Sequence, residues 1–201
     1  MERERGRKIP VEEEKNWIES FLSGEKKVFD NIVMKYQDRV FNLCYRFLGD
    51  YEEAEECAQE VFIKVYNSLR KFKFRSSFST WLYRITVNMC KNRLKILKQQ
   101  RERSRFSLDD PLSLQNGNLE REVGDESLAP LTLIQRKEKE RIIQEAINSL
   151  PPEFKTLIIL RDIDGLSYEE ITGITGLKMG TVKSRIARAR EKLKEKLRGL
   201  I

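Results

Sequence analysis

The chain has 201 residues, a net charge of +7, 35% charged and 39% hydrophobic residues, so it can form one ordinary domain or two small ones. No apolar run approaches the roughly 20 residues that span a bilayer, and no signal-peptide core follows the charged N-terminus, so we expect a cytoplasmic protein without membrane insertion. Because the chain lacks histidine, His-dependent triads and His general bases are excluded.

Charge is distributed unevenly along the chain. One basic run lies between residues 84 and 105 and another between residues 183 and 198, whereas every charge between residues 50 and 60 is acidic. Clustered cations are typical of surfaces that bind polyanions. The pattern predicts two nucleic-acid contacts and one acidic surface for a different partner.

The first half of the chain has the periodicity of helices. Apolar residues between Trp17 and Phe47 recur at three- and four-residue steps, which predicts one amphipathic helix that ends at Gly49 and Asp50. A second helical pattern runs from Ala54 to Leu69, and a third starts near Ser79 and continues past Leu94. We therefore expect a charged extension over residues 1–15 and a helical domain over residues 16–101.

The periodicity disappears after residue 101 and returns near Arg136. Pro, Gly, Asn and Asp interrupt the stretch between them, which predicts a flexible linker over residues 102–135 and a second domain over residues 136–201. No strand pattern of any strength is present. The predicted fold is all-α, with two small helical domains joined by the linker.

Residues 166–190 have the layout of a helix-turn-helix. Ser167 and Glu170 form a capping box, Gly176 fits a C-terminal stop, and a final helix begins near Gly180. Such a motif places its second helix in the major groove. Lys183, Ser184 and Arg188 would then face the DNA; the alternative is a solvated basic face of a structural helix.

The segment KFKFRSSFSTW (71–81) interleaves aromatic and cationic residues. A flipped base can stack on a ring while cations hold its phosphates, which makes Phe72 a candidate single-strand contact. The alternative is that these rings belong to the core.

The cysteines Cys44, Cys57 and Cys90 lack any CxxC spacing and favour buried, reduced thiols, so we expect no metal site and no cofactor.

Several motifs in this order resemble extracytoplasmic-function (ECF) sigma factors of the sigma-E type. They are ECAQEVFIKVY (56–66), FSTWLYRITVN (78–88), LRDIDGLSYEEI (160–171) and GTVKSRIARAR (180–190). The resemblance implies an alternative sigma factor that binds the clamp and flap regions of core RNA polymerase, recognises duplex and melted promoter DNA, and is held inactive by an anti-sigma factor. It implies no enzymatic activity.

The resemblance also implies roles for individual positions. Those near the melted minus-10 strand are Phe72, Arg84, Asn88, Lys91 and Asn92. Those on the minus-35 surface are Arg161, Tyr168, Glu169, Lys183, Ser184, Arg185 and Arg188. Those on the polymerase-docking helix are Gln59, Glu60 and Ile63.

Two other classes of protein remain as alternatives at this point. A duplex-binding regulator that never contacts polymerase would need neither the acidic helix nor the aromatic loop. A recombinase or nuclease with a helix-turn-helix would need clustered carboxylates, and the first domain has none beyond its acidic helix.

The sequence departs from the family pattern at some positions, such as Lys178 in place of a proline and Ala187 in place of an aromatic residue. The promoter sequence that the family prefers therefore cannot be assigned to this chain.

Overall fold

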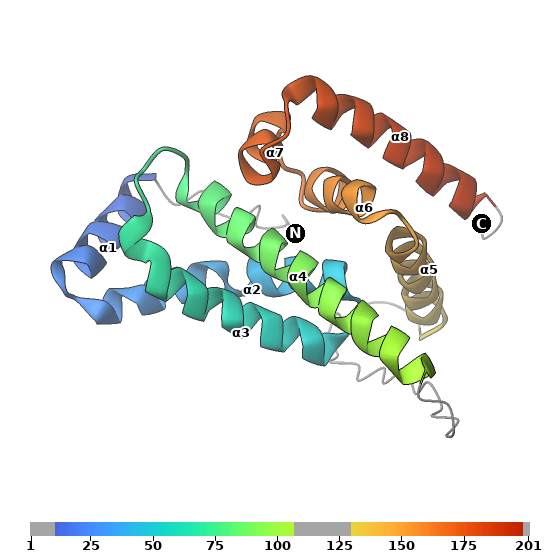
Figure 1. Cartoon of the computed structure of the whole chain (residues 1–201), viewed down its shortest axis with the longest axis horizontal. Coiled ribbons are helices and arrows are strands. Elements are labelled where there is room, and N and C mark those ends of the chain that lie inside the picture. The colour runs from blue at the N-terminus through green and yellow to red at the C-terminus, as the bar shows by residue number, and fades with distance from the viewer. Residues whose placement is uncertain (1–10, 107–129, 199–201) are drawn as a thin grey trace.

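The computed structural model describes residues 11–106 and 130–198, and this part of the chain contains helices and no strand. The elements are α1 (Val11–Ser23), η1 (Lys26–Val28), α2 (Phe29–Leu48), α3 (Tyr51–Ser68), η2 (Leu69–Lys71), α4 (Phe78–Phe106), α5 (Pro130–Asn148), α6 (Pro152–Ile158), η3 (Ile159–Ile163), α7 (Tyr168–Thr175) and α8 (Met179–Leu197). Figure 1 shows α1–α4 as an N-terminal bundle and α5–α8 as a C-terminal group packed beside α4. Of the predicted linker, residues 102–106 continue α4, residues 130–135 begin α5, and the rest lies outside the described residues.

The predicted single helix from Trp17 to Phe47 is wrong. Gly24, at φ +120°, ends α1, and a short 3-10 turn reorients the chain before α2 begins at Phe29. The predicted stop after α2 is confirmed, because Gly49 adopts φ +75° and its N–H donates to the Tyr45 carbonyl. Asp50 then caps α3 by accepting a hydrogen bond from the Glu53 N–H at 2.9 Å.

The core of the N-terminal domain lies where α2, α3 and α4 face one another. The buried residues repeat at helical spacing, so each helix contributes one apolar face. They include Ile32, Tyr36, Val40, Leu43, Phe47, Ala54, Val61, Val65, Leu82 and Val87. The opposite faces of the same helices are left for polar and charged side chains.

The C-terminal domain is built from short helices with well-defined ends. The chain breaks at Pro151, and α6 continues into a turn of π-helix, η3. The predicted capping box is confirmed: the Ser167 N–H donates to Glu170 Oε2 at 2.8 Å, and the Glu170 N–H donates to Ser167 Oγ at 3.1 Å. Gly176, at φ +71°, ends α7 and turns the chain into α8.

The two domains contact each other through α6 and α7. The buried Lys155 of α6 donates from Nζ to the Phe47 carbonyl at 2.5 Å and to Asn148 Oδ1 at 2.7 Å. Burial lowers the pKa of Lys155 to about 8. At Gly173 of α7 an added Cβ would lie 2.9 Å from Thr80 Cγ2, so a larger residue there would force Thr80 or α7 to shift.

Asp164, at the end of η3, gives this domain contact a pH dependence. Its Oδ2 is buried without a hydrogen-bond partner among the described residues. Burial raises the pKa of Asp164 to about 6, although the charges of Arg46 and Arg39 oppose the shift. The folded chain binds the carboxyl proton of Asp164 more tightly than the unfolded chain does. Protonation of Asp164 therefore stabilises the fold in acid, and this stabilisation is lost as the pH rises through about 6.

We predict that the parent becomes less stable relative to the Asp164→Asn variant as the pH rises. The difference between their free energies of unfolding should change by up to about 3 kcal/mol between about pH 4 and about pH 7, since one pKa unit corresponds to about 1.4 kcal/mol. Urea unfolding at a series of pH values measures this difference. A difference that stays constant over that range would show that Asp164 titrates normally.

Candidate nucleic-acid interfaces

The exposed face of α8 carries the residues that the helix-turn-helix pattern singled out. Val182, Ile186 and Ala189 are buried against the rest of the domain. Lys183, Ser184 and Arg188 are exposed, as predicted. The helix therefore presents polar and cationic groups to solvent from its first three turns, the part of a recognition helix that reaches base edges.

A cation and ring cluster lies beside the start of α8. The Arg161 guanidinium carbon lies 4.6 Å from the centre of the Tyr168 ring, and Lys183 Nζ lies 5.6 Å from the same centre. Arg161 also donates to the Leu166 carbonyl at 2.6 Å, which fixes its position. The structure thus brings together three of the predicted minus-35 residues from η3, α7 and α8.

The other predicted residues of this surface are arranged differently. Glu169 is exposed in the first turn of α7. Arg185 is half-buried and pairs with Glu153 at 3.4 Å. Arg190, which was not predicted as a contact, is held by Asp162 through hydrogen bonds of 3.1 and 2.5 Å, and this pairing raises its pKa.

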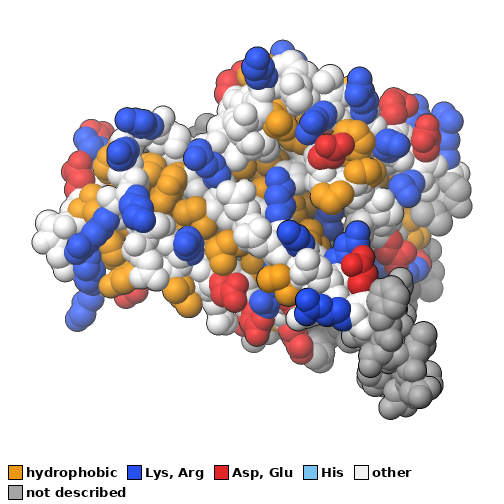
Figure 2. All heavy atoms as spheres, in the orientation of Figure 1, with side chains coloured by type: hydrophobic (Ala, Val, Ile, Leu, Met, Phe, Trp, Pro, Cys, Tyr) orange, Lys and Arg blue, Asp and Glu red, His pale blue; other side chains and the backbone are white. Residues whose placement is uncertain are grey.

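The second candidate surface is one face of α4. Arg84, Asn88, Lys91 and Asn92, the positions that the resemblance assigned to the minus-10 strand, are all exposed. Their spacing of three and four residues places them along one side of the helix. Figure 2 shows Lys and Arg side chains spread over the face of the molecule on which α4 and α8 lie.

The loop before α4 buries Phe72, one of the residues predicted to contact single-stranded DNA. Phe72 is 6% exposed, and its ring lies within an aromatic cluster, 5.8 Å from Phe78 and 5.2 Å from Trp81 between centroids. A base cannot stack on it in this conformation. Phe74 is 44% exposed and adopts φ +54°, a backbone conformation that phenylalanine rarely adopts. The available ring in this loop is therefore Phe74, which the sequence reasoning did not select.

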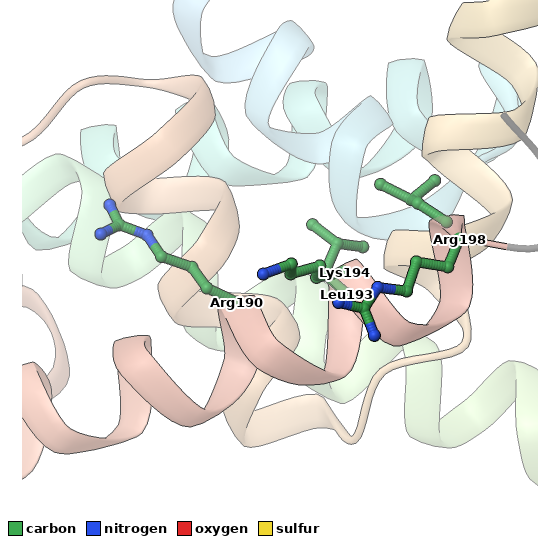
Figure 3. A pocket seen from close by; sticks show the side chains of 5 residues that line it. Arg190, Leu193, Lys194 and Arg198 are labelled. Atoms are coloured by element: carbon green, nitrogen blue, oxygen red, sulfur yellow. The ribbon is translucent and has the colours of Figure 1, made fainter.

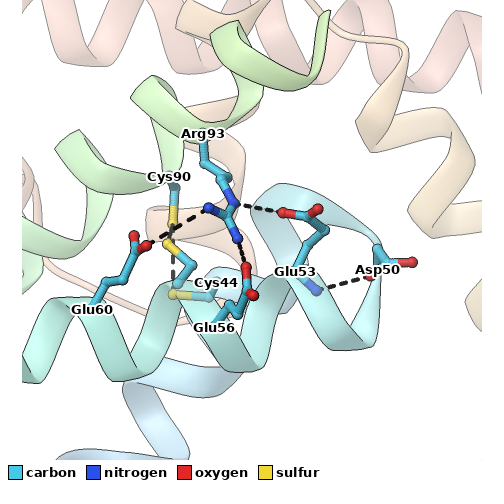
Figure 4. Close-up of polar contacts among 8 residues, drawn as sticks. Cys44, Asp50, Glu53, Glu56, Glu60, Cys90 and Arg93 are labelled. Atoms are coloured by element: carbon cyan, nitrogen blue, oxygen red, sulfur yellow. Dashed lines mark hydrogen bonds and ion pairs between the residues drawn. The ribbon is translucent and has the colours of Figure 1, made fainter. Parts of the chain in front are cut away.

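The acidic helix α3 exposes the residues predicted for a protein partner. Gln59, Glu60 and Ile63 are all exposed, and Ile63 has 61% of its surface accessible. On the side of α3 that faces α4, Arg93 pairs with Glu53, Glu56 and Glu60 (Figure 4). This network ties the acidic helix to α4.

The structure also gathers the three cysteines, which sequence spacing did not suggest. Cys44, Cys57 and Cys90 come from α2, α3 and α4, and all three are buried. Hydrogen bonds with Cys44 and Cys57, together with burial, raise the pKa of Cys90. The prediction of buried, reduced thiols is consistent with this arrangement, but their proximity depends on how the helices pack.

One hollow beside the last turns of α8 is open to solvent. Figure 3 shows its lining from the last turns of that helix: Arg190, Leu193, Lys194 and Arg198 beside Leu197. A shallow groove of this kind suits a macromolecular surface better than an enclosed small-molecule site.

Among the described helices, none is long and apolar enough to cross a membrane. The fold and these surfaces define a two-domain helical protein with a helix-turn-helix and a second basic helix face.

Comparisons with known proteins identify the family. Residues 32–101 match Sigma-70 region 2, and residues 140–193 match Sigma-70, region 4. The chain is 36% identical to the RNA polymerase sigma-H factor of Pseudomonas aeruginosa over 96% of its length and 98% of that protein. It is also 36% identical to the ECF RNA polymerase sigma factor SigW of Bacillus subtilis, over 92% of this chain and 97% of that one.

Solved structures show the same fold. The sigma factor RpoE of Bartonella quintana, solved with the anti-sigma factor NepR, aligns with a TM-score of 0.63 at 22% identity over 86% of this chain and 98% of that one. The chain belongs to the ECF sigma factors, which are non-enzymatic transcription initiation factors that bind core RNA polymerase and promoter DNA.

Proposed function

We propose that the C-terminal domain reads duplex DNA at the minus-35 element through the exposed face of α8. The observation that carries this proposal is the division of α8 into a buried apolar face and an exposed face with Lys183, Ser184 and Arg188. Arg161 and Tyr168 lie beside Lys183, and with the exposed Glu169 of α7 they would contact the backbone or neighbouring bases. The half-buried Arg185, paired with Glu153, would position α8 or contact phosphate from its edge.

The N-terminal domain, in the same proposal, opens and holds the minus-10 element. Arg84, Asn88, Lys91 and Asn92 form an exposed polar face on α4, and the Phe74 ring projects from the loop that precedes this helix. Cations hold phosphates, a ring can stack on an extruded base, and an amide can read its Watson–Crick edge. The protein would contribute binding energy only, while core polymerase carries out the chemistry.

Core polymerase would dock on α3. Gln59, Glu60 and Ile63 form an exposed surface that combines polar groups with a large apolar side chain, as protein interfaces do.

We place the protein in the cytoplasm, where polymerase and DNA are found. An anti-sigma factor is the expected regulator, since the RpoE relative was solved with one.

Run-off transcription with purified core enzyme tests the proposed function. The chain should direct transcription only when core polymerase and a promoter with both elements are present. Alone it should bind duplex DNA weakly, because each small domain offers few base contacts. Tight sequence-specific binding by the isolated chain, with no polymerase pull-down, would instead identify a duplex-binding regulator.

Arg188→Ala should lower activity at promoters with a minus-35 element by roughly tenfold or more, because a bidentate base contact contributes about 1 to 3 kcal/mol. Run-off assays on templates with and without that element measure the effect. Lys192→Ala serves as a matched control, since it removes an exposed cation from the same helix one turn nearer its C-terminal end than Arg188. An equal loss on both templates would contradict duplex reading by Arg188.

A further inference from the structure

Three buried thiols meet in the core of the N-terminal domain. The Cys57 and Cys90 sulfurs are 4.0 Å apart, the Cys90 and Cys44 sulfurs are 3.7 Å apart, and all three lie within 4.8 Å of one another. Each cysteine has at most 1% of its surface exposed. Figure 4 shows Cys90 next to Arg93, with Cys44 close by.

The spacing of the sulfurs matches what one metal ion requires. A metal–thiolate bond is about 2.3 Å long. Three sulfurs arranged in a plane around one ion would therefore lie about 4.0 Å apart, since the side of such a triangle is √3 times the bond length. Two of the observed separations are already close to this value. A disulfide, by contrast, would use two sulfurs at about 2.05 Å and leave the third unused.

We propose that Cys44, Cys57 and Cys90 form a three-sulfur site for a thiophilic cation, Cu(I). Soft thiolate ligands favour Cu(I) and Zn²⁺ among the metals that proteins bind. Zn²⁺ in structural sites takes four ligands, and the chain has no histidine, while the described residues place no fourth cysteine or carboxylate in this cluster. A closed site with three sulfurs therefore suits Cu(I) better.

Cu(I) binding replaces the thiol protons with the metal ion and involves no electron transfer. Three S–H groups release three protons to the buffer and three Cu–S bonds form, which leaves a net charge of 2− on the site. The Lys155 ammonium is buried, and it donates to the carbonyl of Phe47, on the same helix α2 as Cys44. No carboxylate in the described part of the chain forms an ion pair with Lys155. Lys155 therefore supplies a positive charge that a loaded site needs.

Because Lys155 belongs to α6, the site is coupled to the domain contact. Its ammonium already bridges the domains by donating to the Phe47 carbonyl. Negative charge on the sulfurs would hold the ammonium more strongly in this place. Copper loading is thus expected to strengthen the contact between the two domains.

The test is an anaerobic titration of the reduced full-length chain with Cu(I) in competition with bicinchoninate. We expect one ion per chain, and X-ray absorption should show three sulfur neighbours at roughly 2.3 Å. Cys57→Ala and Cys90→Ala should each lose at least a hundredfold in affinity, and Lys155→Met roughly tenfold. Val61→Ala is the matched control: it removes buried carbon from the same helix as Cys57 and should keep its copper.

Three results would overturn the proposal. Cysteine variants that bind Cu(I) as tightly as the parent would show adventitious binding elsewhere. An equal loss in Val61→Ala would show that a folding defect, not a lost ligand, removes copper. Tighter binding of Zn²⁺ than of Cu(I) in the same competition would reject the copper assignment. Run-off transcription by the metal-free chain tests the sigma-factor function by itself, so its failure is distinguished from a failure of the copper site.

Discussion

Phe72→Ala should destabilise the N-terminal domain by about 3 to 5 kcal/mol, the usual cost of removing a buried phenylalanine. The ring is 6% exposed and contacts Phe74, Phe78 and Trp81, so its loss leaves a cavity between the loop and α4. Urea unfolding followed by circular dichroism measures the change. Such a loss is a large part of the 5 to 15 kcal/mol that holds a typical domain together.

Phe74→Ala is the matched control, because it removes the same ring from an exposed position in the same loop. Its free energy of unfolding should change much less than in Phe72→Ala, since the Phe74 ring is 44% exposed and its loss removes a ring contact with Phe72 at the edge of the cluster. If Phe72→Ala unfolds at the same urea concentration as the parent, the ring is not part of the core. The loop would then have to adopt another conformation in solution.

The helix-turn-helix could be predicted from sequence because its signals are local. The Ser167 and Glu170 capping box, the left-handed Gly176 and the apolar spacing of Val182, Ile186 and Ala189 each involve residues within a few positions of one another. The exposed face of α8 follows directly from that spacing. Arg84 and Asn88, which were selected by the family resemblance and not by spacing, are both exposed on α4.

What sequence reasoning missed depends on packing between distant segments. Phe72 and Phe74 have nearly the same local context, and only the position of Trp81 and the left-handed backbone at Phe74 decide which ring is buried. Helical periodicity alone continued through Gly24, although its φ of +120° ends α1 there. The meeting of Cys44 and Cys90 likewise depends on how α2 crosses α4.

The domain contact could not be predicted for the same reason. A lysine within the apolar pattern of α6 gives no sign that its ammonium will reach a carbonyl of α2 at 2.5 Å. Gly173 also looks like an ordinary helix residue until Thr80 of α4 is seen beside it. These positions set how the two surfaces proposed to bind DNA are held relative to each other in the isolated chain.

Asn88→Ala and Phe74→Ala should each assemble with core polymerase but give little permanganate-reactive open promoter on closed duplex. Both side chains are exposed on the surface proposed to hold the melted strand, so their loss should leave the fold intact. Unstacking a base costs a few kcal/mol, which contacts to the extruded base must offset. We expect roughly a tenfold or greater loss of open complex for each variant, as one stacking contact contributes about 1 to 3 kcal/mol.

A template whose minus-10 region is already mismatched distinguishes the two roles, because it removes the cost of melting. Phe74→Ala should recover substantially on this template, since stacking tolerates any base and helps mainly with opening. Asn88→Ala should remain weak and should lose its preference for the native strand sequence, because amide hydrogen bonds read a particular base edge. If both variants open closed duplex as well as the parent does, neither the loop nor this face of α4 holds the melted strand, and the single-strand contact must lie elsewhere in the chain.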